Sequence, residues 1–212
     1  GVALVEEGVE LRRLGIDQPI LVLGSAFSGQ ENDILEYRLT PVIYDLDCAR
    51  RLDGFVRNAE TTIDYHLKVD TGMGRLGFRV ELLDEILAIL KQLKNLNMVG
   101  LMSHLAVADE PERPLTSVQY QAFVEVVARV EQHGFNPRYR HIANSAGIYS
   151  RALSGCNLVR PGICLYGGLT GGPYAEEFTQ QPVMHFISQV AQLKIVPSGG
   201  GVSYGPRLVA SR

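Results

Sequence analysis

A polar series lies on one face of a predicted strand at residues 63–69. Alternate side chains of a strand face the same side, so Asp64, His66, Lys68 and Asp70 share one face, opposite an apolar face. Burying an unpaired charge is costly, so these groups must be paired or used in chemistry. Two interpretations stay open: an internal ion pair between Lys68 and Asp70, or a functional site, because buried charges often mark such sites.

The loop after this strand reads Asp-Thr-Gly-Met-Gly-Arg and ends in Arg75. Its glycines give the backbone freedom at the strand end. An arginine presents a planar fork of donors that suits a carboxylate or phenolate oxygen. We therefore expect Arg75 to contact an anionic group.

Polar residues also follow other apolar runs. His104 comes directly after the run 98–102, where structural and functional roles are both open. Ser145, after Asn144, stands at a predicted helix start, which fits either an ordinary N-cap or a phosphate site. His141 lies inside its strand, so we expect a structural role for it.

A further candidate group comes late in the chain. Arg160 follows a short apolar run, and Gly162 with Ile163 follows Arg160. A glycine there lets the backbone approach an anion closely. Tyr204 lies in a glycine-rich turn, which by itself is a weak functional signal.

The elements that must position these residues alternate along the chain. Seven apolar runs of strand length precede Gly168, and amphipathic segments separate most of them. The runs lie at 2–5, 19–23, 40–46, 63–69, 98–102, 139–142 and 158–159. Helices are expected at 6–14, 32–37, from an N-cap at Asp45 or Asp47 to about 59, at 82–93, and from a capping box at Thr116–Gln119 to about Gly134. This alternation predicts parallel βαβ units.

Both a doubly wound sheet and a (β/α)₈ barrel without its first unit fit this order. Polar residues follow several different strands, which favours the barrel, because a barrel collects its chemistry from many strand ends. A doubly wound sheet would concentrate its polar residues at one switch point. We expect an α/β barrel over residues 1–172. The β-rich stretch 173–212 is expected to begin a second, mostly β domain.

Composition excludes several classes of partner. The net charge is −3 and signs are mixed, so neither nucleic acid nor a membrane surface is an expected partner. The three cysteines have no metal-like spacing, and an odd number of thiols is typical of a cytoplasmic protein. No metal site is expected.

Taken together, the motifs LKVDTGMGRLGF, SHLAVADEP, HIANSAGIY, VRPGICLYG and VSYG resemble the alanine racemases in order and spacing. The resemblance covers essentially the whole chain, and KVDTGMGRLGF is its most specific element. It implies a barrel that binds pyridoxal 5′-phosphate (PLP), a β-rich C-terminal domain and a homodimer that interconverts L- and D-alanine, the latter a building block of peptidoglycan.

The resemblance also assigns roles to residues. Arg160 matches the arginine at the pyridine nitrogen, His104 the histidine that packs on the ring, and Ser145, Gly162 and Ile163 part of the phosphate cradle. Arg75 matches the arginine near the phenolic oxygen and the substrate carboxylate. Lys68 matches a lysine that is often carbamylated, and Tyr204 the second acid/base, which acts across the dimer interface.

The covalently linking lysine of the family, and a phosphate-binding tyrosine close to it, have no counterpart in this sequence. The lysine that links covalently to PLP precedes residue 1 in the family pattern, so we expect this chain alone to be inactive. The alternatives are a racemase of another amino acid such as serine, and a non-catalytic PLP-binding barrel. The motif DTGMGR argues against decarboxylases on the same barrel.

Overall fold

The computed structural model describes the chain except residues 60, 150–154, 169–179, 206–207 and 212. The chain forms two compact units, Gly1–Gln181 and Pro182–Arg212. The expected domain boundary after residue 172 lies outside the described residues, so it stays a prediction.

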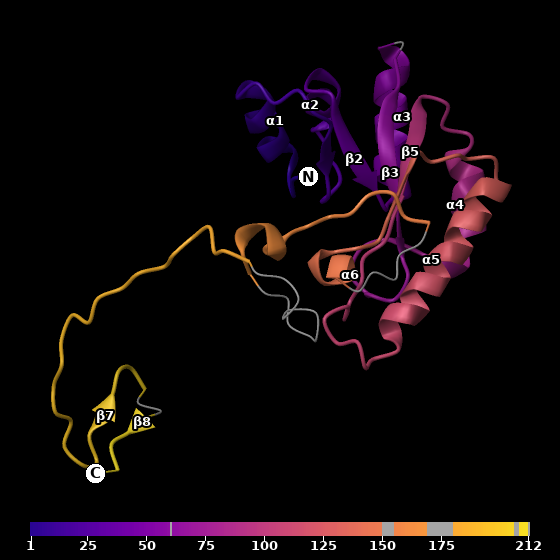
Figure 1. Ribbon diagram of the computed structural model, residues 1–212. Helices are drawn as coiled ribbons and strands as arrows, with labels where there is room; N and C mark the ends of the chain where they lie inside the picture. The colour runs from indigo at the N-terminus through magenta and orange to yellow at the C-terminus, as the bar shows by residue number, and fades with distance from the viewer. Residues whose placement is uncertain (60, 150–154, 169–179, 206–207, 212) are drawn as a thin grey trace. The chain divides into compact units, whose positions relative to one another are not determined.

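The first unit is built on a parallel sheet (Figure 1). Its main path follows the chain order: β1 (Ile20–Val22), β2 (Leu39–Ile43), β3 (Ile63–Asp70), β5 (Leu96–Met102) and β6 (Tyr139–His141). The short β4 (Phe78–Arg79) pairs with β3 off this path. A doubly wound sheet reverses its strand order at a switch point, whereas barrel strands follow one another. The predicted α/β fold, a partial barrel, is therefore confirmed.

Two of the predicted strands, both at the edges of the sheet, do not form regular strands. In the run 2–5, Val2 makes a single bridge with Val22, and Val5 already begins a helix. At 158–159 the chain runs beside β6 without forming a ladder. It is tied there by the Asn157 N–H to Arg140 O (3.1 Å) and the Arg160 N–H to Ala143 O (3.0 Å). These bonds still fix where Arg160 leaves the sheet.

The helices follow the predicted alternation. They are α1 (Val5–Arg13), α2 (Glu31–Glu36), α3 (Leu46–Asn58), α4 (Leu83–Leu90), α5 (Leu115–Gln132) and α6 (Ser145–Tyr149), with 3₁₀ turns at Val80–Leu82 and Ile163–Tyr166. The apolar residues of β3 are all buried, and α3 packs against this strand. The apolar face predicted for β3 therefore packs in the core, while its polar face carries the candidate residues.

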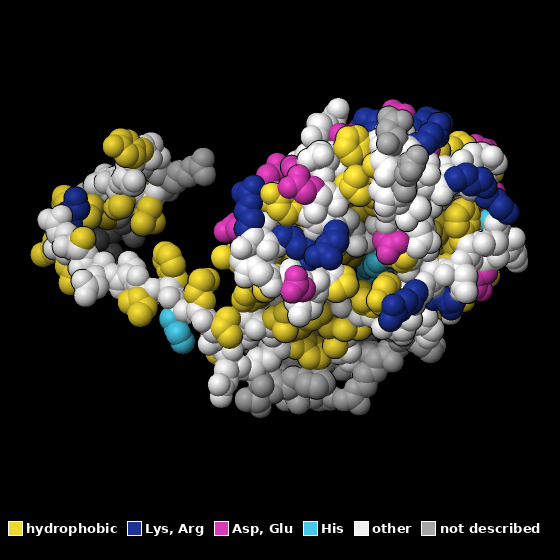
Figure 2. All heavy atoms as spheres, turned by 90° about the horizontal axis from the view of Figure 1, so that it is seen from above, with side chains coloured by type: hydrophobic (Ala, Val, Ile, Leu, Met, Phe, Trp, Pro, Cys, Tyr) yellow, Lys and Arg dark blue, Asp and Glu magenta, His cyan; other side chains and the backbone are white. Residues whose placement is uncertain are grey.

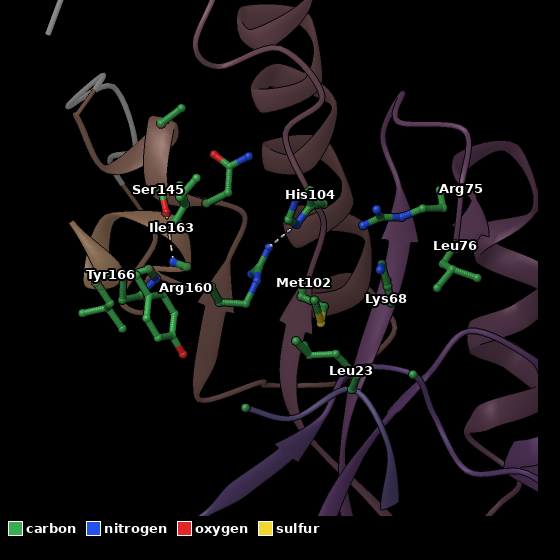
Figure 3. A pocket seen from close by; sticks show the side chains of 18 of the residues that line it. Leu23, Lys68, Arg75, Leu76, Met102, His104, Ser145, Arg160, Ile163 and Tyr166 are labelled. Carbon is green, nitrogen blue, oxygen red and sulfur yellow. Dashed lines mark hydrogen bonds between the residues drawn. The ribbon is translucent and has the colours of Figure 1, made fainter. Parts of the chain in front are cut away.

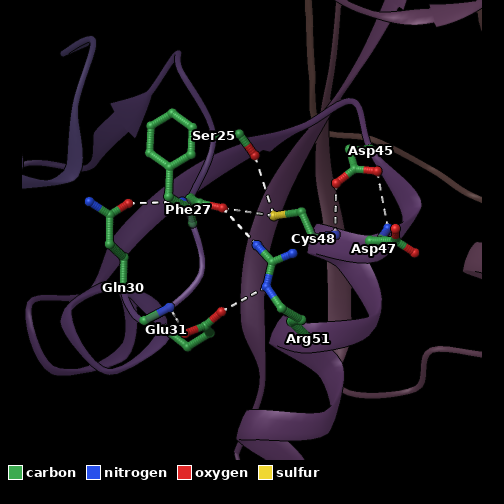
Figure 4. A network of polar contacts seen from close by, with 10 residues as sticks. Ser25, Phe27, Gln30, Glu31, Asp45, Asp47, Cys48 and Arg51 are labelled. Atoms are coloured by element: carbon green, nitrogen blue, oxygen red, sulfur yellow. Dashed lines mark hydrogen bonds and ion pairs between the residues drawn. The ribbon is translucent and has the colours of Figure 1, made fainter.

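The start of α3 anchors the loop that follows β1 (Figure 4). Asp45 is the N-cap, as predicted, and its carboxylate accepts hydrogen bonds from the N–H groups of Asp47 (3.2 Å) and Cys48 (3.0 Å). The Arg51 guanidinium donates to Ala26 O and to Glu31, each at 3.0 Å. These contacts hold the loop after β1 at the carboxyl end of the sheet.

The predicted capping box at the start of α5 is wrong. Pro114 is the N-cap residue and makes no side-chain cap bond. The hydroxyl of Thr116 is buried and has no hydrogen-bond partner within the described residues. Val118 is 58% exposed, whereas Phe123, Val126 and Val130 are buried and form the face that packs in the core.

The second unit contains one small hairpin. β7 (Gly201–Val202) and β8 (Leu208–Val209) pair antiparallel. The segment 182–196 was predicted to be β-rich, but it forms no regular strand, because the described residues offer none to pair with it. Its apolar side chains are exposed, as the hydrophobic atoms of this unit in Figure 2 show. In the described part of both units, every helix is too short or too polar to cross a membrane.

Candidate active site

A cavity of about 980 Å³ opens at the carboxyl ends of the parallel strands (Figure 3). β3 brings Lys68 to it, the loop after β3 brings Arg75, and β5 is followed by His104. From the other side come Arg160 and the loop around Ser145. Of the predicted site residues, those that line this cavity are Lys68, Arg75, His104, Ser145, Arg160, Gly162 and Ile163.

Tyr204 is the predicted site residue that the cavity does not include. It follows β7 in the second unit, and its side chain is fully exposed. Its expected role as an acid/base therefore stays a prediction.

Arg160 is held from several directions. Its Nη2 donates to the carbonyl oxygens of Ser103 (2.6 Å) and Ile142 (3.3 Å) and lies 3.2 Å from Nδ1 of His104. Its Nη1 lies 2.5 Å from Nδ1 of His141. Burial lowers the pKa of Arg160 to about 10, so the guanidinium stays charged at neutral pH.

Two buried histidines continue this network away from the cavity. Nε2 of His141 lies 2.7 Å from Nδ1 of His66. Burial and then the charge of Arg160 lower the pKa of His141 to about 2 and that of His66 to about 4. Both rings are neutral at pH 7, and His141, expected to be structural, in fact contacts a predicted site residue.

The interpretation of Lys68 and Asp70 as an ion pair is wrong. Burial alone would raise the pKa of Asp70. Hydrogen bonds from four backbone N–H groups of the following loop, including those of Gly72 (2.9 Å) and Met73 (2.8 Å), lower it instead. Asp70 thus folds the loop that carries Arg75, and within the described part of the chain Lys68 forms no salt bridge.

Lys68 is an amine in an unfavourable place for a positive charge. Its side chain is only 6% exposed. Burial, then the charges of Arg75 and Arg160, lower its pKa to about 8. Burial, then the charges of Arg160, Arg75 and Lys68, lower the pKa of His104 to about 4. Near neutral pH the neutral amine is therefore a minor form of Lys68, but a far larger one than for an exposed lysine.

Ser145 organises the opposite wall of the cavity. Its hydroxyl is buried and accepts hydrogen bonds from the N–H groups of Gly162 (2.9 Å) and Cys164 (3.3 Å). A Cβ atom at position 162 would lie 3.7 Å from Oγ of Ser145, so glycine keeps the space beside this hydroxyl open.

The charge of the lining favours an anionic ligand. Lys68, Arg75 and Arg160 line the cavity, whereas Asp109 is the single carboxylate among the described lining residues. Elsewhere the face seen in Figure 2 mixes charges of both signs. A cavity lined mainly by one sign of charge attracts ligands of the opposite sign.

Comparison with known proteins gives a consistent result. The family model "Alanine racemase, N-terminal domain" matches residues 1–170. The alanine racemase of Geobacter sulfurreducens is 41% identical over 99% of this chain. The crystal structure of the Streptomyces lavendulae enzyme matches 99% of this chain with a TM-score of 0.81 and 31% identity. The Bacillus anthracis enzyme, solved with bound L-Ala-P, matches 97% with a TM-score of 0.78 and 31% identity.

This chain spans 56% of the length of the Geobacter sulfurreducens relative, and 56% and 54% of the two solved chains. The match to the family model covers most of the chain and includes every residue that lines the cavity. The sequence motifs, the strand order and these likenesses agree, and the chain belongs to the alanine racemase family.

Proposed function

We propose that the protein containing this chain interconverts L- and D-alanine with the help of PLP. The observation that carries the proposal is the cationic cavity at the strand ends, in which a partly buried arginine, a buried lysine and a buried hydroxyl converge. Bound PLP would supply an electron-withdrawing ring that stabilises negative charge at the substrate Cα.

The residues present fit the proposed cofactor. Within the described residues, the contacts of Arg160 use its two terminal nitrogens, which leaves its Nε–H to donate to a ring nitrogen. The space beside Ser145 and Gly162 suits a phosphate, because the Ser145 hydroxyl accepts from two backbone N–H groups and keeps its own proton to donate to a phosphate oxygen. His104 would pack on the ring, as the family resemblance implies.

Arg75 would orient the substrate by its carboxylate. Its guanidinium lies in the cavity on the same side as Lys68 (Figure 3). We propose that Lys68 reacts as a neutral amine with CO₂, forming a C–N bond and releasing a proton. The carbamate is an anion, and an anion at Lys68 would hold Arg75 in place.

Racemisation needs a proton donor and acceptor on each face of the substrate Cα. We propose that Tyr204 of a second copy of the chain serves one face, in a homodimer. The other face would be served by the lysine that binds PLP covalently in the family, which has no counterpart within this sequence. The three cysteines are free thiols, which is consistent with the proposed cytoplasmic location.

The test is an assay of the complete protein that contains this chain, loaded with PLP. Conversion of D-alanine and of L-alanine is followed by chiral separation, beside D- and L-serine. The proposal expects alanine conversion in both directions, with serine slower. If serine is converted faster than alanine, the proposed substrate is serine rather than alanine. No turnover of either amino acid, with PLP bound, would support a non-catalytic PLP-binding barrel instead.

A further inference from the structure

Gln119 is a buried polar side chain to which the proposed chemistry gives no task. It lies in the first turns of α5, and its side chain is fully buried. The sequence pattern assigned it to a capping box with Thr116, but α5 has no side-chain cap. A buried amide keeps its place only where its donors and acceptor find partners.

The partners of Gln119 belong to the loop after β5. Its Nε2 donates to the carbonyl oxygen of His104 at 2.9 Å. Its Oε1 accepts from the N–H of Ala106, also at 2.9 Å. A carbonyl can only accept and an N–H can only donate, so these two partners fix the orientation of the amide. The backbone on both sides of Leu105 is thus held from α5.

The same side chain also touches the loop after β3. A Cβ atom at Gly72 would lie 3.3 Å from Cγ of Gln119, so the loop backbone packs directly against the glutamine stem. Gly72 belongs to the turn that Asp70 folds and that leads to Arg75. Gln119 therefore contacts both the loop that carries His104 and the loop that carries Arg75.

We infer that Gln119 is a positioning residue that couples the His104 loop to the Arg75 loop, an inference that rests on the proposed function. Its amide sets the backbone position of His104, and its stem limits how far the Gly72 turn can move. A misplacement of about 1 Å in such a site costs up to about a hundredfold in rate. Removing the amide would leave the partly buried carbonyl of His104 and N–H of Ala106 without these partners.

Asn144 supports the same loop from the other side. Its Nδ2 donates to Leu105 O at 3.1 Å, and its Oδ1 accepts from the N–H of Gly147 at 3.0 Å. With Asn144 in place, loss of Gln119 frees the loop on one side only. We therefore expect altered positions rather than loss of the fold.

The decisive variant is Gln119→Glu in the complete protein. A protonated carboxyl group can donate to His104 O and accept from the Ala106 N–H, as the amide does. The carboxylate cannot donate, and it repels the carbonyl oxygen. We expect alanine racemisation by this variant to approach the wild-type rate at low pH and to fall about tenfold or more below it as the pH rises. Burial raises the pKa of such a carboxyl group, so the fall comes above the usual range for glutamate.

The matched control is Gln121→Glu, an exposed glutamine in the same helix. It should follow the wild-type pH profile throughout. A merely structural role for Gln119 would lower the rate of the Gln119→Glu variant by a constant factor at every pH. A constant ratio to the wild type would therefore overturn the inference.

A second measurement does not depend on activity. In the PLP-free complete protein, Gln119→Met removes both hydrogen bonds at nearly equal volume. We expect amide exchange at Ala106 to accelerate about tenfold or more, with faster exchange also in residues 71–76. Unchanged exchange in both segments would overturn the inference. If the wild type fails to racemise alanine, the proposed function falls, and the exchange data still decide whether Gln119 couples the loops.

Discussion

The charge of Arg160 determines where the protons of two buried histidines lie. A guanidinium can only donate, so Nδ1 of His141 must accept from it. In the neutral ring the proton then sits on Nε2 of His141, which donates to Nδ1 of His66. His66 in turn carries its proton on Nε2. Each N–H therefore points away from Arg160, so the nearer end of each ring dipole is negative and stabilises the positive charge.

We predict that His66 and His141 are both neutral Nε2–H tautomers from pH 5 to pH 8. Nitrogen-15 NMR of the histidine rings in the complete protein distinguishes the two tautomers and the charged form. Unfolded histidine binds a proton near pH ~6.5, so acidification below that pH favours the unfolded state. A ring that titrates between pH 6 and 7, or a proton on Nδ1 of His141, would contradict this network.

Lys68 gives a second prediction at this scale. Its pKa of about 8 means that the neutral amine becomes the major form only above that pH. At constant dissolved ¹³CO₂, we expect a carbamate carbon signal that grows as the pH rises from 6.5 to 8.5. Lys68→Gln should abolish the signal, and the exposed Lys94→Gln should leave it unchanged. A signal that survives Lys68→Gln would place the carbamate elsewhere.

At the residue scale, the sequence predicted which side chains gather but not what holds them. Strand alternation and strand ends were enough to predict Lys68, His104 and Arg160, which line one cavity. The link from His141 to His66 joins residues far apart in sequence, and no local pattern reports it. The prediction for Gln119 was wrong for the same reason. A capping box is a local pattern, whereas the hydrogen-bond partners of Gln119 lie in the loop after β5.

At the element scale, β5 leaves no room for a side chain at Gly100, opposite His66 of β3. A Cβ atom there would lie 2.3 Å from Cγ of the His66 ring, on the strand pair where the register shifts. The ring is buried and is held by contacts with Tyr139 and His141. The absence of a side chain at one strand position thus lets His66 reach the network.

We predict that Gly100→Ala lowers the free energy of unfolding by about 1–3 kcal/mol through overpacking. It should also shift the ring nitrogen signals of His66 and His141. Urea unfolding of the complete protein and the NMR experiment above measure both effects. A variant with wild-type stability and unchanged ring signals would show that the strand pair has spare room.

The control is Gly54→Ala, within α3. A Cβ atom there meets nothing within 4 Å, and alanine is the better helix former. This variant should raise the free energy of unfolding by about 0.5–1 kcal/mol. The two substitutions should change the free energy of unfolding in opposite directions. This difference separates the steric effect at the strand position from a general effect of replacing glycine.

Element boundaries followed the sequence where a local signal existed. The Asp45 cap of α3 and the buried face of β3 were predicted, because capping and alternation are local properties. The run 158–159 and the segment 182–196 were predicted as strands from apolar content. Strand formation needs a partner, which composition does not reveal, and the described residues supply no full ladder for either.

At the scale of the whole molecule, the consecutive strand order explains why the site residues come from so many segments. Each parallel strand ends on the same side of the sheet, so each crossover can place one more side chain around the cavity. The strand order was predictable from the scattered polar residues. No local sequence pattern indicates that a residue of a second copy of the chain contributes to the site. Tyr204 is assigned to the site only by the family resemblance.

The shared-site proposal predicts that two inactive variants of the complete protein restore activity when they form mixed dimers. Arg160→Ala should disable the cavity of its own subunit, and Tyr204→Phe should disable the cavity of its partner. In a mixed dimer, one cavity then combines both defects, while the other has an intact Arg160 and receives an intact Tyr204. Statistical exchange of subunits makes half of the dimers mixed, so activity should recover to about a quarter of the wild-type value. Unfolding and refolding the two variants together, beside each variant alone, measures the recovery. If Tyr204 served its own subunit, each subunit of every mixed dimer would carry one defect, and the mixture would remain inactive.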